Sequence, residues 1–427
     1  MPNRPPLYRV TVFVLGDLGR SPRMLNHALA LAADGAAVSL IGYNESALEN
    51  AVAKNPSIRV FGISTIRRAS DNASRSAFFL RTALRTAWLG MHSLWLLLAG
   101  TPRPNIILVQ NPPSFPTLFV AWIAARLRGS RLIVDWHNFG YSMLAMRLGD
   151  DHSVVRRAKV WERRLSRKAH AHFCVSSAMQ ERLIAEFGLK SPVVLLDKPR
   201  ELFPVVPISA RADRARELLR DQGIDLPSGA AFAVSPTSWT ADEDMPLLFD
   251  GLQVWDSQNS PGGPKLLVLI TGRGPLRAVF ESRSQALRWR RIILRTAFLD
   301  PAVYRGLLCA AHFGFCLHRS SSGVDLPMKI IDLFGARTPV CAFDYGNSLS
   351  EQIAPGVTAV TFRDPGQLAH EIDQLLQGFP ENPWFLDRIQ SNITKLCTET
   401  WQDAWSRQAT PVMRELAGVS DMRAPPV

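Results

Sequence analysis

The sequence predicts an α/β protein with two domains, each built around a mainly parallel β-sheet. The chain has 427 residues, more than a single hydrophobic core usually encloses. Apolar runs of strand length alternate with helical patterns, which is typical of parallel sheets. The alternation stops at a proline-rich passage, 198–207, and then starts again. We therefore expect domains at 1–200 and 201–400, followed by a segment at 401–427.

Each expected strand is a short apolar run that helical patterns separate from the next. In the first domain these runs lie at 10–15, 38–41, 106–109, 132–135, 171–175 and 193–196. In the second domain they lie at 232–235, 266–271, 292–294, 313–317 and 340–342. Residues 401–418 have a helical pattern, and we expect this C-terminal helix to return to the first domain.

The net charge of +12 favours acidic partners, such as nucleic acid, anionic lipid or a phosphate-bearing substrate. The first apolar run, 10–15, is too short for a signal peptide. The weakly charged stretch 86–100 is shorter than the ~20 residues that a membrane span requires. We therefore expect neither a signal peptide nor a transmembrane helix.

Residues 76–100 have the composition of a helix that lies on a membrane surface. Arg81, Arg85 and His92 fall on one helical face, among phenylalanine, leucine and tryptophan residues. A surface helix packed against the protein core would show a similar pattern. We expect peripheral membrane binding, with the core-packed helix as the alternative.

The first expected strand ends in a turn that could approach an anion. Gly16 and Gly19 allow close approach of the backbone, and Arg20 and Arg23 can contact phosphate oxygens. The turn does not match G-x-G-x-x-G, and no acidic residue clearly ends the second strand. Both features disfavour a dinucleotide site.

The strand at 132–135 leads into a second polar group that contains Asp135 and His137. Ligands of open α/β sheets bind at the carboxyl ends of the strands. A histidine at such an end can accept a proton from a hydroxyl group near neutral pH, and Asp135 can orient it.

In the second domain, the run from Ser320 to Lys329 follows a strand and opens a helical pattern. Asp325 suits a helix cap, and Pro327 suits the first helical position. Backbone N–H groups at a helix start favour a phosphate. This run therefore predicts an anion site.

Two other turns follow strands of the second domain, at 237–244 and 271–276. Thr240 can cap the next helix, with Glu243 completing a capping box. The acidic residues 242–244 lack a nearby histidine or cysteine, and we expect no metal site there.

Together with Gln110-Asn111-Pro112-Pro113-Ser114, these segments resemble motifs of the chitobiosyldiphosphodolichol β-mannosyltransferase family and occur in the order that the family has. The resemblance extends from about Val10 to about Ile353. The resemblance implies the GT-B fold, with two Rossmann-like domains facing a cleft. It also implies transfer from GDP-mannose, without metal or cofactor, to a polyprenyl- or dolichyl-diphosphate-linked acceptor that contains GlcNAc. Eukaryotic members begin with a membrane anchor, whereas the first strand comes almost at once here, so the acceptor lipid is less defined than the donor.

A β-mannoside formed from an α-linked donor requires inversion and a base for the acceptor hydroxyl. We predict His137 as that base, with Asp135 and Asp17 as alternatives. The predicted donor-binding residues are Thr237, Ser238, Trp239, Gly272, Arg273, Gly274, Arg319, Ser320, Ser321, Ser322, Gly323, Asp325, Lys329 and Asp332. The predicted acceptor-binding residues are Gly16, Gly19, Arg20, Ser21, Arg23, Gln110, Asn111, Pro113, Phe115, Phe119, Trp122, Asn138 and Tyr141.

Three other functions are compatible with parts of the sequence. A GT-B transferase could add a different sugar to an undecaprenyl-linked glycan for a surface polysaccharide. A non-enzymatic basic protein could bind membranes or nucleic acid, and an oxidoreductase could use a dinucleotide fold. We expect the transferase, at the cytoplasmic face of a membrane and without a nucleic-acid partner.

Overall fold

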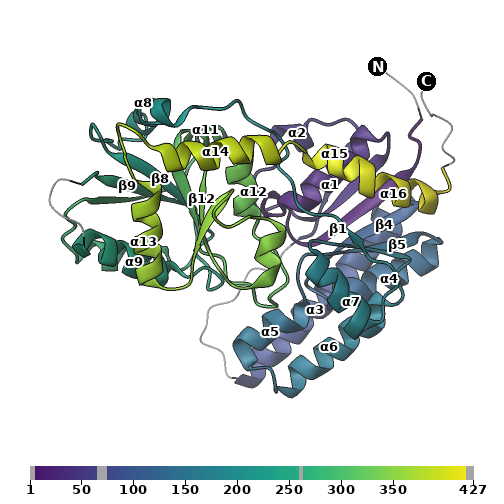
Figure 1. The fold of residues 1–427 in the computed structure, drawn as a ribbon. Helices are drawn as coiled ribbons and strands as arrows, with labels where there is room; N and C mark the ends of the chain where they lie inside the picture. The colour runs from purple at the N-terminus through teal and green to yellow at the C-terminus, as the bar shows by residue number, and fades with distance from the viewer. Residues whose placement is uncertain (1–4, 65–74, 259–262, 420–427) are drawn as a thin grey trace, which may run out of the picture. The chain divides into compact units, whose positions relative to one another are not determined.

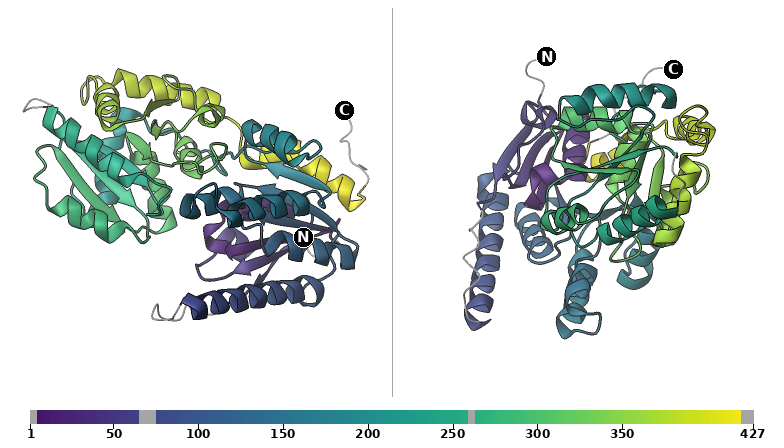
Figure 2. Two further views of the ribbon diagram at one scale, coloured as in Figure 1. Left: turned by 90° about the horizontal axis from the view of Figure 1, so that it is seen from below. Right: turned by 90° about the vertical axis from the view of Figure 1, so that its left-hand side faces the viewer.

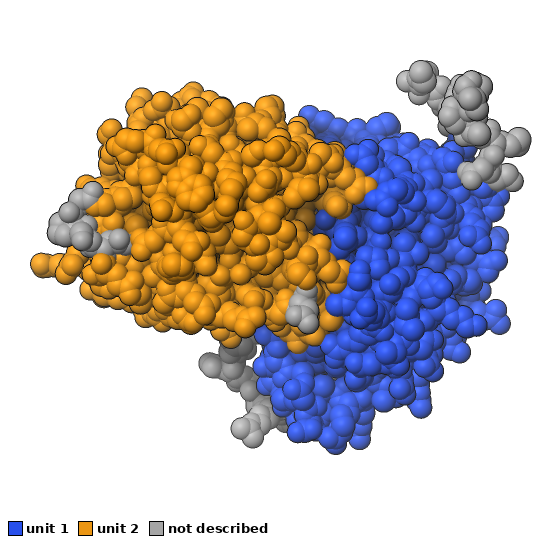
Figure 3. Space-filling view, viewed as in Figure 1, with its two compact units in different colours: residues 1–197, 401–427 blue, residues 198–400 orange. Residues whose placement is uncertain are grey.

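A computed structural model describes residues 5–64, 75–258 and 263–419. The chain forms two compact units, which Figure 3 shows in different colours. Unit 1 comprises Met1–Asp197 and Trp401–Val427, and unit 2 comprises Lys198–Thr400. Each unit contains its own parallel sheet and its own hydrophobic core. The predicted α/β class is therefore confirmed.

Unit 1 is built on a seven-stranded sheet with the order β3-β2-β1-β4-β5-β6-β7, in which every pair is parallel. Its strands are β1 (Arg9–Asp17), β2 (Ala37–Tyr43), β3 (Ile58–Gly62), β4 (Ile106–Asn111), β5 (Arg131–Trp136), β6 (Ala171–Cys174) and β7 (Val193–Val194). Strand β3 was not predicted, because Arg59 interrupts its apolar run.

The first helices of unit 1 are α1 (Pro22–Ala33), α2 (Asn50–Ala53) and α3 (Arg75–Trp95), which continues as a π-helical turn, Leu96–Gly100. They are followed by α4 (Thr117–Arg128), α5 (Gly140–Leu148), α6 (Ser153–Ser166) and α7 (Ser177–Phe187). Helix α3 packs on α4, α4 on α6, and α6 on α5. Both views of Figure 2 show α3 as a long helix at the margin of unit 1.

The C-terminal segment forms two helices, α15 (Trp401–Gln408) and α16 (Thr410–Ala417), where the sequence predicted one. Pro411 lies in the first turn of α16, a position that tolerates proline because that N–H has no partner inside the helix. Trp401, Trp405 and Met413 are buried in the same core cluster as strand β1. The C-terminal helices therefore complete unit 1 (Figure 1).

Unit 2 has a six-stranded parallel sheet with the order β10-β9-β8-β11-β12-β13. Its strands are β8 (Ala231–Pro236), β9 (Leu266–Thr271), β10 (Ile292–Ala297), β11 (Phe313–Cys316), β12 (Val340–Phe343) and β13 (Ala359–Phe362). Its helices are α8 (Ile208–Arg220), α9 (Met245–Gln258), α10 (Arg277–Gln285), α11 (Pro301–Ala310), α12 (Met328–Gly335), α13 (Pro365–Leu375) and α14 (Trp384–Leu396). The edge strand β13 was not predicted.

The strand order reverses between β1 and β4 in unit 1, and between β8 and β11 in unit 2. Ligands of such sheets bind outside the carboxyl ends of the strands at these switch points. The predicted polar turns follow β1, β4 and β5 in unit 1, and β8, β9 and β11 in unit 2. Across the described parts of the chain, no helix is long and apolar enough to span a membrane.

Candidate functional site

A buried ion cluster surrounds Asp135, at the carboxyl end of β5. Arg23 of α1 binds this carboxylate with two hydrogen bonds, from Nε to Oδ2 and from Nη2 to Oδ1, each 2.9 Å long. Its Nη1 donates to Asp197 Oδ1 and to the Leu195 carbonyl oxygen, both at 2.8 Å. One guanidinium thus joins two buried carboxylates.

Two histidines also contact Asp135 Oδ2, His137 Nε2 at 2.7 Å and His27 Nε2 at 3.2 Å. Burial acts to raise the pKa of Asp135, but the charge of Arg23 and the two histidines hold that pKa well below its ordinary value. The carboxylate is ionised, so each Nε2 is the donor. Only His137 reaches solvent among these residues, with 23% of its side chain exposed. Within the described residues, its Nδ1 makes no hydrogen bond.

This cluster corrects two of the predicted roles. Arg23 is buried and its donors are bound to Asp135, Asp197 and a carbonyl oxygen, so it is not available for an acceptor phosphate. Asp135 is fully buried and accepts four hydrogen bonds, which leaves it no access to an acceptor hydroxyl. Asp135 is placed to orient His137 instead.

Asp17, the other alternative base, ends β1 and is bound by the following loop. It accepts hydrogen bonds from the Ser46 hydroxyl, from the Ser46 N–H at 3.1 Å and from the Glu45 N–H at 3.3 Å. Burial acts to raise the pKa of Asp17, but these hydrogen bonds lower it overall, which weakens Asp17 as a base. A Cβ on Gly19 would lie 2.8 Å from Ser46 Cβ, so Gly19 permits this contact.

The predicted acceptor residues around β1 and β4 differ in exposure. Arg20 is largely exposed, with its Nε 3.8 Å from Asp17 Oδ2, whereas the Ser21 hydroxyl donates to the Asp17 carbonyl oxygen. The other predicted residues that reach solvent are Gly16, Gly19, Gln110, Pro113, Phe115, Phe119, Trp122 and Asn138. These residues remain candidates for contact with an acceptor.

Glu162 of α6 was not identified from the sequence, and it organises the turn after β4. Its Oε1 accepts hydrogen bonds from Asn111 Nδ2 at 2.7 Å and from the Gly140 N–H at 2.8 Å. Its Oε2 accepts one from the Tyr141 N–H at 3.2 Å, so Glu162 caps the start of α5. Its distance in sequence from Asn111 explains why no local pattern revealed it.

Two predicted acceptor residues are structural. Asn111 is fully buried, where it contacts Glu162 and donates to the Asn138 carbonyl oxygen at 3.2 Å. Tyr141 is buried against Phe187, and its hydroxyl accepts a hydrogen bond from Arg182 at 2.8 Å. Neither side chain is positioned to contact an acceptor.

In unit 2, Glu243 organises the turn after β8. This buried carboxylate accepts hydrogen bonds from the Thr237 hydroxyl, from the Ser238 N–H at 2.8 Å and from the Trp239 N–H at 3.0 Å. It also contacts the Lys329 ammonium group. Glu243 therefore serves the 237–239 turn rather than the predicted capping box at Thr240.

The real cap of α9 is Asp244, whose Oδ1 accepts a hydrogen bond from the Leu247 N–H at 3.1 Å.

Three other predicted donor residues fit tightly together. Trp239 is fully buried, and its indole donates to the Gly272 carbonyl oxygen at 3.2 Å. A Cβ on Gly272 would lie 1.8 Å from Thr237 O, and one on Gly274 would lie 1.9 Å from Ser238 O. These three residues pack the turns together.

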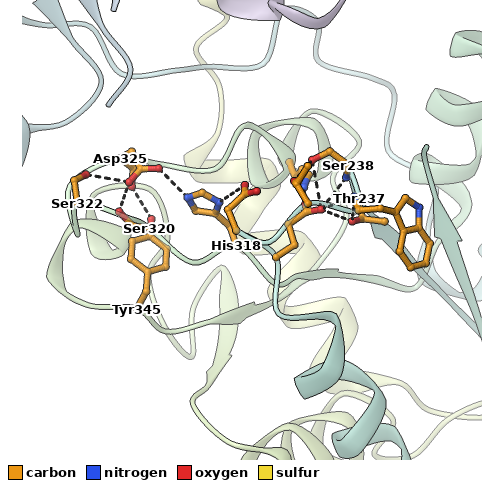
Figure 4. A network of polar contacts seen from close by, with 12 residues as sticks. Thr237, Ser238, His318, Ser320, Ser322, Asp325 and Tyr345 are labelled. Carbon is orange, nitrogen blue, oxygen red and sulfur yellow. Dashed lines mark hydrogen bonds and ion pairs between the residues drawn. The ribbon is translucent and has the colours of Figure 1, made fainter. Parts of the chain in front are cut away.

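His318, which follows β11 at the switch point, is the centre of a polar network (Figure 4). Its Nε2 lies 2.9 Å from Asp325 Oδ2, and its Nδ1 lies 3.8 Å from Asp242 Oδ2. Asp325 also accepts hydrogen bonds from the hydroxyls of Ser320 and Ser322. His318 was not predicted as a site residue, although it closely follows an expected strand, as His137 does.

Asp325 is therefore not a helix cap, and the start of α12 differs from the prediction. The helix begins at Met328, with Pro327 in the cap position. The Gly323 N–H donates to Ser320 Oγ at 2.7 Å, and the Val324 N–H donates to Ser322 Oγ at 3.4 Å. Two of the N–H groups expected to bind phosphate are thus bonded within the loop.

The cations of this region differ in their partners. Arg319 Nη2 lies 2.5 Å from Asp244 Oδ2, and Lys329 contacts Glu243. Arg273 is exposed and stacks 3.6 Å from the ring centre of Phe298. Among the described residues, Arg273 has no carboxylate partner, so its charge is the most available to an anion.

The remaining predicted donor residues lie close to these cations in sequence. Asp332 is exposed on α12 and accepts a hydrogen bond from the Tyr304 hydroxyl at 3.4 Å. Ser321 is half-buried in the loop before α12.

Across the described ranges, no group of three or more histidine, cysteine, aspartate or glutamate residues is arranged to hold a metal ion.

Comparison with known proteins agrees with this fold. Residues 19–197 match the glycosyl transferase 4-like domain family. A sucrose-phosphate synthase from Thermosynechococcus elongatus has a TM-score of 0.66 at 14% identity, with 96% of this chain and 99% of that chain covered. The two Rossmann-like domains and this similarity define a GT-B fold.

The chain belongs to the chitobiosyldiphosphodolichol β-mannosyltransferase family. It is 32% identical to the chitobiosyldiphosphodolichol beta-mannosyltransferase of Pongo abelii, over 95% of this chain and 92% of the relative. It is also 33% identical to the UDP-glycosyltransferase TURAN of Arabidopsis thaliana, over 96% of this chain and 97% of the relative. The resemblance inferred from the sequence is confirmed.

Proposed function

We propose that this protein transfers mannose from GDP-mannose to a chitobiose unit carried on a lipid diphosphate, with inversion at the anomeric carbon. Family membership supports the acceptor class, because a relative over nearly the whole chain is named for that reaction. The observation that carries the mechanism is the His137–Asp135 pair, in which an accessible imidazole is bound to a buried, ionised carboxylate.

In the proposed reaction, the acceptor hydroxyl oxygen attacks the anomeric carbon of mannose while the bond from that carbon to the phosphate oxygen breaks. The hydroxyl proton passes to His137, and GDP leaves with the electrons of the broken bond. Asp135 stabilises the resulting imidazolium and keeps its ring in place, as a carboxylate does in other histidine-based sites. Asp135 itself is not protonated.

The leaving diphosphate requires positive charge, which unit 2 supplies from Arg273, Arg319 and Lys329. Arg273 is the principal candidate, because Arg319 and Lys329 are each paired with a carboxylate. These cations can stabilise a diphosphate without a metal ion, and we propose a metal-independent reaction that needs no cofactor.

We also propose that the protein binds the cytoplasmic face of a membrane through α3. Three large apolar residues of α3 are exposed on one side, Leu84 at 61%, Met91 at 67% and Trp95 at 57%. The opposite side is buried at Leu89 and Ser93 of α3 and at Leu97 of the π-helical turn that follows it. The side chain of Arg81 lies outside the described residues, and Arg85 is half-buried. Exposed apolar residues on a basic protein suit an anionic lipid surface.

A UDP-sugar is the competing donor, because the Arabidopsis relative is named a UDP-glycosyltransferase. The purified chain should be assayed with GDP-mannose, UDP-glucose and UDP-GlcNAc, each with chitobiose on dolichyl or undecaprenyl diphosphate. We expect mannose transfer from GDP-mannose alone, in EDTA, together with a rise in Tm on adding GDP. Transfer from a UDP-sugar alone would refute the donor, and a metal requirement would refute the metal-free reaction.

A further inference from the structure

Trp405 of α15 reaches the Asp135 cluster through a second histidine. Its indole Nε1 donates to His27 Nδ1 at 3.0 Å, and His27 Nε2 lies 3.2 Å from Asp135 Oδ2. Both side chains are fully buried. The hydrogen bonds therefore form a chain from the C-terminal helix, through α1, to the carboxylate that holds His137.

This arrangement fixes the position of the proton on His27. Because Nδ1 accepts the indole N–H, the proton of the neutral ring is on Nε2, where it is donated to Asp135. Protonating Nδ1 as well would place two N–H groups against each other. Burial also favours the neutral ring and lowers the pKa of His27, although Asp135 opposes that shift.

We propose that Trp405 is a positioning residue for the transfer reaction, because it keeps His27 uncharged. A neutral His27 does not offset the negative charge of Asp135, which then acts on Arg23 and His137. His137 then donates Nε2–H to Asp135 and presents Nδ1 as the base. The link to catalysis depends on the proposed function, whereas the charge and tautomer of His27 do not.

The charged and titratable groups of this cluster set the direction of the expected effect. They are Arg23 and His27 from α1, Asp135 from β5, His137 directly after β5, and Asp197 after β7. If His27 became an imidazolium, its positive charge would offset Asp135 and disfavour a second imidazolium at His137. Transfer of a proton from the acceptor to His137 would then be less favourable, so His137 would be a weaker base.

Trp401 provides a matched control on the same helix. Its ring is also buried, 5.2 Å from the His27 ring and 5.1 Å from the Arg23 guanidinium carbon. Within the described residues, however, its indole nitrogen has no hydrogen-bond partner. Trp401→Phe therefore tests packing, whereas Trp405→Phe also removes the N–H that binds His27.

We expect Trp405→Phe to lower kcat roughly tenfold and to move the acid limb of the pH profile of kcat/KM to lower pH. Trp401→Phe should keep both close to those of the unchanged protein. An acid limb that stays in place, or that moves to higher pH, overturns the role of Trp405 in catalysis. Equal loss of kcat in the two variants overturns it as well.

The ¹⁵N chemical shifts of the histidine side chains test the same idea without any substrate. In the unchanged protein, His27 should be protonated on Nε2 alone near neutral pH. In Trp405→Phe, His27 should acquire a second proton at a higher pH than in Trp401→Phe. Protonation of His27 on Nδ1 in the unchanged protein overturns the inference. If the shifts agree but no mannose is transferred, the proposed function fails while the role of Trp405 in the charge of His27 stands.

Discussion

At the scale of single residues, His137 differs from the other histidines of its ion cluster and sheet in reaching solvent while it contacts a buried carboxylate. We expect His137→Ala to lower kcat by roughly 10²–10⁴, the usual contribution of a general base. The Tm should change little, because the side chain is partly exposed and Asp135 keeps its bonds to Arg23 and His27. Steady-state kinetics and thermal unfolding of the same preparation provide the measurement.

Asp17→Asn distinguishes the remaining alternative base. Asn keeps an oxygen for the N–H groups of Glu45 and Ser46 but cannot accept a proton at neutral pH. The loss of kcat should be far smaller than in His137→Ala. A larger loss of kcat in Asp17→Asn would indicate that Asp17 is the base. A much lower Tm of His137→Ala would indicate that His137 is a packing residue.

The charge of Arg273 leads to a separate expectation about the donor. Arg273→Ala should raise the KM for the nucleotide-sugar roughly tenfold and leave the KM for the acceptor unchanged, because Arg273 is the cation of its region without a carboxylate partner among the described residues. Arg288→Ala, which removes an exposed arginine elsewhere in unit 2, is the control. An unchanged donor KM in Arg273→Ala would exclude this residue from the donor site.

The sequence identified Asp135 and His137 because each lies near the end of a recognisable strand. It did not reveal that Arg23, Asn111 and Trp239 are buried, because residue type does not fix depth. An arginine after a glycine turn suits a phosphate or a buried carboxylate equally well. Which of the two an arginine binds depends on residues far away in the sequence. For Arg23 that residue is Asp135, 112 positions away.

At the scale of elements, α6 holds the start of α5 and the turn after β4 through one carboxylate. Glu162→Ala would leave the N–H groups of Gly140 and Tyr141 without their acceptor, and Asn111 Nδ2 would keep only the Asn138 carbonyl oxygen. We expect a loss of stability on the order of 3 kcal/mol, since each unsatisfied buried donor costs about 1–3 kcal/mol. Denaturant unfolding of Glu162→Ala beside Glu181→Ala, an exposed glutamate of α7, measures this difference. Equal stability of the two variants would contradict the expectation.

Helix α3 leads to a prediction about membrane binding. Replacing Leu84, Met91 and Trp95 together by serine should reduce binding to vesicles with anionic lipid at least tenfold, because these residues supply the exposed apolar side of the helix. Val279 and Leu396 are equally exposed apolar residues of unit 2, so the double change to serine at these positions is the control. Cosedimentation with vesicles gives the affinities, and equal binding of both variants would refute the role of α3.

The elements that the sequence predicted are those with continuous apolar runs, which interior strands of a parallel sheet require. Strands β3 and β13 were missed because Arg59 and Thr361 interrupt their short apolar runs. The edge strands β7 and β10 were predicted because each begins with uninterrupted apolar residues. The break between α15 and α16 was missed because the apolar spacing continues across Thr410 and Pro411.

At the scale of the whole molecule, each unit contains one strongly buried histidine outside the site. In unit 1, His172 Nδ1 accepts a hydrogen bond from Trp136 Nε1 at 3.2 Å, and burial lowers the pKa of His172 to about 4. In unit 2, His312 Nδ1 accepts one from the Phe232 N–H at 3.0 Å, and burial lowers the pKa of His312 to about 3. Both rings are therefore neutral in the folded protein at pH 5.

This difference makes stability depend on pH with a defined sign. The unfolded chain binds protons at these histidines below about pH 6.5, whereas the folded units do not until far lower pH. Stability is therefore full well above pH 6.5 and falls as the pH falls, by about 2 kcal/mol for each histidine between pH 7 and pH 5. His27, whose pKa burial also lowers, acts in the same direction, whereas Asp135 matters only below about pH 4.

The prediction is tested by urea unfolding at pH 7, 6 and 5 for the unchanged chain, His172→Asn and His312→Asn. Asparagine can place an oxygen near the position of Nδ1, where it accepts the same hydrogen bond, but it does not titrate. Each variant should therefore lose less stability than the unchanged chain between pH 7 and pH 5, in the unit that carries the change. A pH dependence identical to that of the unchanged chain would mean that the replaced histidine is already protonated when folded, contrary to its burial beside Trp136 or Phe232.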